Sequence, residues 1–115
     1  MAALKIFTVS YRGIRIKVRL LPTVADVHRE YTEGKRLRNG TTVHAFFAPM
    51  YSPAAKCTGT VVLPMDGKLE ELIPHEVTHA VLHKVRVCVA GDDEGFATAV
   101  GILSARITRR IEARQ

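Results

Sequence analysis

Residues 75–79 place two histidines and a glutamate at a spacing that could hold a metal ion, in the sequence His75-Glu76-Val77-Thr78-His79. On a helix, residues four positions apart lie on one face, so the two imidazoles can converge on a single ion. Neutral imidazole nitrogen binds zinc at about 2.0–2.1 Å. The motif therefore predicts a metal centre with one Zn²⁺ per chain, bound by His75 and His79.

The glutamate of the motif has the position of a general base. Glu76 follows His75 directly and lies about 100° round the helix from it, beside the expected metal. From there its carboxylate can take a proton from a zinc-bound water, the expected nucleophile, and pass it to a leaving amine. The alternative is a helix with two surface histidines and an incidental glutamate. Neighbouring apolar residues disfavour that alternative, because they would bury the rest of the helix: Val77, Ala80, Val81 and Leu82.

A catalytic zinc site needs a third protein ligand as well as an open position. His83 comes four residues after His79, but three histidines on one straight helix spread over about 12 Å, too far for one ion. An acidic residue from a second helix fits better, and Asp92, Asp93 and Glu94 are the candidates.

We favour Glu94 as this ligand, because Asp93 can instead cap the last helix. The assignment requires the motif helix to end near His83, so that an extended segment can bring Glu94 back toward His79. Glu94 also begins a stripe of small residues that is expected to let the two helices approach closely: Ala97, Gly101 and Ala105.

Two strands and a helix are expected at the start of the chain. Alternating residues predict strands over 6–10 and 14–20, joined by a turn at Tyr11-Arg12-Gly13. Thr23 can cap a helix over 24–33, and Gly34 can end it. Two further apolar runs predict strands, because each is rich in β-branched or aromatic residues and stops at a proline: Val43–Ala48 and Thr58–Leu63.

The helix of the motif contains Pro74, which lacks an N–H and crowds the preceding turn. This helix is expected to begin near Ile73, or else to begin near Lys68 and bend at the proline. Valines in 85–89 favour an extended path, so the helix should end near His83 or Lys84. A last helix should start near Asp93, with a stripe of apolar residues facing the core: Phe96, Val100, Leu103, Ile107 and Ile111.

The length of 115 residues suits one domain over residues 1–115, and 47% hydrophobic with 24% charged residues is typical of a globular chain. No apolar run is long enough to span a membrane, and no secretion signal is apparent. Two cysteines are too few for a disulfide framework. The expected location is the cytoplasm.

A formal charge of +6 raises the question of an anionic partner. The last helix carries four arginines, three of them at intervals of four residues: Arg106, Arg109, Arg110 and Arg114. Such a stripe could attract nucleic acid. A solvated helix face is the simpler interpretation, because no alternation of aromatic and basic residues accompanies the stripe. Nucleic acid is therefore a possible partner, but not the favoured one.

Two segments together resemble the gluzincin metallopeptidases, which combine H-E-x-x-H with a glutamate ligand on a second helix: His75-Glu76-Val77-Thr78-His79-Ala80 and Glu94-Gly95-Phe96-Ala97. The short chain is similar to the single-domain minigluzincins and other small zincins. The run Gly59–Pro64 resembles the strand that such proteins often carry before the active helix. The resemblance extends over residues 43–105.

The resemblance implies an α+β, zincin-like fold: a small, twisted, mostly antiparallel sheet with a backing helix, an active-site helix and a C-terminal glutamate helix. It implies hydrolysis of peptide bonds, by an endopeptidase in preference to an exopeptidase. A peptide or protein substrate would pair with an edge strand, either Val43–Ala48 or Thr58–Leu63. The family usually adds a His or Tyr that steadies the oxyanion; His83, His44 and Tyr51 are candidates, and none matches a motif.

Two other interpretations stay open. The chain could be a non-catalytic, metal-stabilised binding module on a zincin scaffold, phage-encoded or associated with nucleic acid. It could also be a latent enzyme whose basic tail, Arg109–Gln115, blocks its own cleft.

Overall fold

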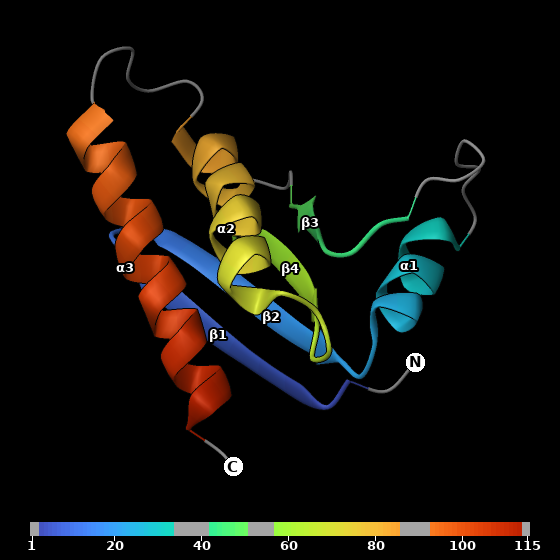
Figure 1. Cartoon of the computed structure of the whole chain (residues 1–115). Helices are drawn as coiled ribbons and strands as arrows, with labels where there is room; N and C mark the ends of the chain where they lie inside the picture. Colours follow the sequence, from blue (N-terminus) through green and yellow to red (C-terminus); the bar gives the residue numbers. More distant parts are fainter. Residues whose placement is uncertain (1–2, 34–41, 51–56, 86–92, 114–115) are drawn as a thin grey trace.

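A computed structural model of the chain describes residues 3–33, 42–50, 57–85 and 93–113, which form an α+β domain with a mixed sheet (Figure 1). The elements are, in chain order, β1 (Lys5–Tyr11), β2 (Ile14–Leu21), α1 (Val24–Thr32), β3 (Phe46–Pro49), β4 (Gly59–Pro64), α2 (Leu69–Val85) and α3 (Asp93–Glu112). The α+β class is thus confirmed. None of the described helices has the length and apolar character needed to cross a bilayer.

The first two strands form the expected hairpin. Arg12 and Gly13 both have positive φ, 47° and 84°, as the two central residues of a tight hairpin turn require. β1 and β2 pair in antiparallel register from Lys5 with Leu20 to Tyr11 with Ile14. Along β2 the alternate apolar residues are buried, while Arg15 and Lys17 are exposed.

The four strands lie in the order β1-β2-β4-β3. β2 and β4 run parallel, whereas β1–β2 and β3–β4 are antiparallel, so the sheet is mixed and mostly antiparallel, as expected. β4 is an inner strand with both sides occupied. Of the two strands considered for pairing with a substrate, only β3 therefore lies at an edge of the sheet.

Helix α1 covers one face of the sheet. Thr23 caps it through a reciprocal capping box with Asp26, as its position before the apolar run indicated. The helix buries Val27 against Leu21 and Val62. Because neighbouring residues of a strand point to opposite faces, the adjacent Val61 belongs to the core on the other side.

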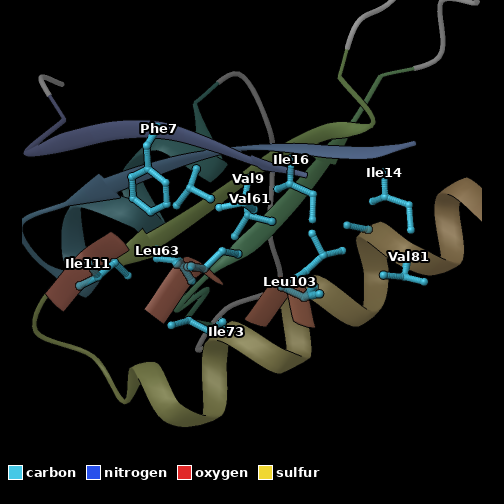
Figure 2. Close-up of a cluster of buried hydrophobic side chains, with 14 of the residues drawn as sticks. Phe7, Val9, Ile14, Ile16, Val61, Leu63, Ile73, Val81, Leu103 and Ile111 are labelled. Carbon is cyan, nitrogen blue, oxygen red and sulfur yellow. The ribbon is translucent and has the colours of Figure 1, made fainter. Parts of the chain in front are cut away.

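Helices α2 and α3 lie side by side on that other face and enclose the main core (Figures 1 and 2). α2 is continuous through Pro74 from Leu69 to Val85, so the longer of the two expected helices is the observed one. The described part of α2 reaches Val85, and the next residues lie outside the described ranges, so the predicted stop near His83 or Lys84 stays a prediction. The buried residues of α2 that face the core are Ile73, Val77, Ala80 and Val81.

Helix α3 begins at Asp93, as expected, and its apolar stripe faces the core. Leu103, Ile107 and Ile111 are buried, and Phe96 and Val100 pack against them. The expectation of close helix packing through the small residues is wrong, because that side of α3 is exposed. The exposed stripe consists of Glu94, Ala97, Gly101 and Ala105.

Candidate metal centre

The two histidines of the motif lie on one exposed face of α2. The Nε2 atoms of His75 and His79 are 3.3 Å apart, and their rings meet edge to face. Two nitrogen ligands at about 2.0–2.1 Å from a tetrahedral zinc ion lie about 3.3–3.4 Å from each other. The pair therefore has the separation of two corners of a zinc tetrahedron.

Glu76 occupies the boundary between this face and the core. Its side chain is 7% exposed, against 67% for His75, and its Oε2 atom lies 3.9 Å from His75 Nε2. Burial raises the pKa of Glu76 above the usual glutamate value, while the charges of His75 and His79 act in the opposite direction. A carboxylate with a raised pKa holds a proton more readily, which suits proton transfer near neutral pH.

An open cleft of about 600 Å³ lies in front of these residues, between α2 and β3. Five of its lining residues come from α2: His75, Glu76, His79, Leu82 and His83. The opposite wall is mostly apolar and comes from β3 and the segment before it: Val43, Ala45, Phe46, Phe47 and Pro49. The motif therefore faces the edge strand of the sheet across a space that a peptide could enter.

His83 lies in the cleft one turn beyond His79. Its Nε2 atom is 3.1 Å from the main-chain oxygen of Met50, and because a carbonyl oxygen only accepts, the ring nitrogen must donate. The ring also lies 5.8 Å from that of Phe47. His83 thus holds the end of β3 against α2.

No described acidic residue completes a three-ligand metal site with His75 and His79 in this structure. Among the described residues, no group of three or more His, Cys, Asp or Glu could hold a metal ion. Glu94 lies in the first turn of α3 on its exposed side, so its assignment as a ligand stays a prediction. Asp93 opens α3, but its side chain, like the whole of Asp92, lies outside what the structure describes.

The other two candidates for an oxyanion-binding residue, His44 and Tyr51, are not among the residues that line the cleft in the described part of the chain. His44 is exposed and does not line the cleft, although Val43 and Ala45 on either side of it do. Tyr51 lies outside the described residues. No described residue of α3 lines the cleft, so the described part of the basic tail, residues 109–113, does not block it. Residues 114–115 lie outside the described range.

Tyr31 of α1 also lines the cleft, although no motif in the sequence marks it. Its ring packs edge to face on Phe46 with centroids 5.0 Å apart. In the same helix, His28 Nδ1 accepts a 3.0 Å hydrogen bond from the N–H of Val43. These contacts hold the segment that leads into β3 against α1. They join residues that are far apart in the sequence, so they could not be predicted without knowing the order of the strands.

Comparison with the models of known protein families found no match, and neither the curated proteins nor the solved structures include one.

Proposed function

We propose that the chain is a zinc-dependent endopeptidase of the gluzincin type, with a zincin-like fold. The observation that carries the proposal is the 3.3 Å separation of the His75 and His79 Nε2 atoms, beside a buried glutamate and facing a cleft. None of these features would be needed by a helix that merely presents two histidines to solvent.

In this proposal His75 and His79 are two of the metal ligands and Glu94 is the third. A bound zinc ion would lower the pKa of a water molecule and polarise a carbonyl group. Glu94 is exposed in the first turn of α3, so its carboxylate would have to turn toward the histidines when the ion binds. The four-residue spacing of the histidines needs no such change.

Glu76 would serve as the general base. Its carboxylate lies next to the metal-binding face, and its pKa is raised by burial, so it can accept a proton and return it to the leaving amine. Burial among the side chains of α2 also restricts the rotamers of Glu76, which keeps the carboxylate in place for both transfers.

A substrate would bind in extended form along β3. This strand lies at the edge of the sheet, and it forms the cleft wall opposite the motif together with Val43 and Ala45. Main-chain hydrogen bonds to an edge strand give affinity, and pockets for alternate side chains give specificity. The apolar lining from Phe47 and Leu82 favours apolar side chains near the bond that is cleaved.

The decisive experiment compares zinc content and cleavage of a peptide library in the wild type and in Glu76→Gln. The wild type is expected to contain one zinc ion per chain and to lose activity when a chelator removes it. Glu76→Gln should retain the zinc, while its cleavage rate should fall by about 10²–10⁴-fold.

Glu71→Gln is the matched control, because Glu71 is an exposed glutamate on the same helix. It should leave both zinc content and cleavage unchanged. Full activity of Glu76→Gln would exclude Glu76 as the base. Zinc binding without any cleavage by the wild type would favour the non-catalytic binding module.

A further inference from the structure

A second hollow, of about 280 Å³, lies at the opposite edge of the sheet, between β1 and α3. Three exposed arginines of α3 line it together with three consecutive residues of β1: Arg106, Arg109, Arg110, Thr8, Val9 and Ser10. No residue of this hollow belongs to the cleft of the motif. It is therefore a separate site, and its lining is cationic.

Two of these arginines are held in place by β1. Arg106 donates a hydrogen bond to the main-chain oxygen of Ser10, and Arg110 donates one of 3.4 Å to that of Thr8. Arg110 also lies over the ring of Phe7, 4.7 Å from its centroid. A guanidinium group has five N–H donors, so each arginine keeps donors for an external acceptor. Such fixed side chains lose little entropy on binding.

The side chains of Thr8 and Ser10 point to the sheet face opposite α3, because their neighbours Phe7 and Val9 point to the core. Ser10 pairs with Arg15 and Thr8 pairs with Lys17, and in each pair the two side chains lie on the same face of the sheet. All four residues are exposed. Two rows thus lead across this face to the edge of β1, where arginines of α3 reach the main-chain oxygens from the other face of the sheet: Arg15–Ser10–Arg106 and Lys17–Thr8–Arg110.

These two rows, called the basic rows, carry positive charge and no acidic side chain. None of the four strands contains an aspartate or a glutamate. Arg19, the next cation along β2, pairs with Glu30 of α1 and is not counted in the rows. Glu112 is a carboxylate on α3 near Arg110, at the end of the surface. The hairpin and α3 therefore present cations with hydroxyl groups between them.

We propose that the basic rows bind nucleic acid through its phosphodiester backbone, independently of sequence. Arginine donors and hydroxyl groups are the usual partners of phosphate oxygens. The rows are spaced by two residues along the strands, about 6.6–6.8 Å, so that they can follow successive charges of an extended polyanion. Exposed Ile6 lies on the same face of β1 as Thr8, two residues along the strand, so an anionic membrane surface is tested as a rival partner.

The test measures binding of the full chain to a labelled single-stranded oligonucleotide, and to its duplex, by fluorescence anisotropy over a range of salt concentrations. The wild type should bind, with an affinity that falls steeply as salt rises. Arg15→Gln combined with Lys17→Gln should weaken binding by at least about tenfold. The same pair should reduce the slope against the logarithm of salt by about 0.7–0.9 for each phosphate that the protein no longer neutralises.

Lys68→Gln combined with Lys84→Gln is the matched control, because it removes the same charge from exposed residues at the two ends of α2. It should bind almost as the wild type does. Arg109→Gln is a second, independent variant in the hollow and should also weaken binding. Equal losses of affinity in the control pair, or unchanged binding in the hairpin pair, would overturn the proposal.

Two further probes separate nucleic acid from other anions. Vesicles with phosphatidylserine and a poly-glutamate peptide should both bind more weakly than the oligonucleotide. A preference for either of them would overturn the proposal. Glu76→Gln should not change nucleic-acid binding, so this result is independent of whether the chain is a peptidase.

Discussion

His83 on α2 and Met50 after β3 are joined by a 3.1 Å hydrogen bond between the imidazole Nε2 and the main-chain oxygen. His83 lines the cleft on α2, and Met50 directly follows Pro49 of the opposite wall, so this bond ties the two walls together at one end.

Removal of this hydrogen bond should loosen the edge strand. His83→Ala is expected to lower the free energy of unfolding by about 1 kcal/mol, the usual worth of one such bond, measured by urea denaturation. His44→Ala is the control, because His44 is exposed outside the cleft, and it should have almost no effect. Equal effects of the two substitutions would mean that the contact with Met50 does not stabilise the fold.

The buried carboxyl group of Glu76 should make the metal-free protein less stable as the pH rises. Because its pKa is raised in the folded chain, the unfolded chain ionises first once the pH passes the ordinary glutamate value of 4.5. The free energy of unfolding should therefore fall from that pH up to the raised pKa. Glu76→Gln should show a smaller fall in urea titrations at several pH values; identical curves would contradict the destabilising role of the charge.

The identity of the third ligand can be tested by zinc affinity, measured in competition with a chelating dye. Glu94→Ala is expected to weaken zinc binding by at least about tenfold, since even residues that only support metal ligands are worth that much. Glu71→Ala, which removes an exposed glutamate from α2, should not change it. An unchanged affinity in Glu94→Ala, with a weaker affinity in Asp93→Ala, would move the ligand to Asp93.

Gly59 of β4 allows β3 to lie close to it. A Cβ atom at this position would be 2.5 Å from a ring carbon of Phe47 and 2.6 Å from the oxygen of Ala48. Gly59→Ala should therefore displace β3 and lower the free energy of unfolding by about 1–3 kcal/mol. Gly101→Ala, in open space on α3, should instead raise it by about 0.5–1 kcal/mol. Thermal unfolding of both variants measures the difference.

Local features of the fold were predictable from the sequence, because they depend on neighbouring residues. The hairpin turn at Arg12 and Gly13, the cap at Thr23 and the start of α3 at Asp93 are all of this kind. The facing pair of histidines is also local, since one helical turn joins them.

Features that depend on distant contacts were not predictable. β3 starts at Phe46 and not at Val43, because the N–H of Val43 bonds to His28 of α1. The small residues of α3 face solvent because the larger apolar stripe of the same helix fills the core. The sequence alone did not show which of these two sides of the helix would be buried. The entry of Tyr31 into the cleft follows from the position of β3 at the sheet edge.

The two edges of the sheet also differ in how they could meet a second copy of the chain. Arg106 and Arg110 occupy outward carbonyl groups of β1, which disfavours strand pairing there. Within the described part of the sheet, the edge left for pairing is β3, which borders the cleft. Self-association through β3 would cover the metal-binding face of both copies. Concentrated protein would then compete with its own substrate, and dilution would restore access.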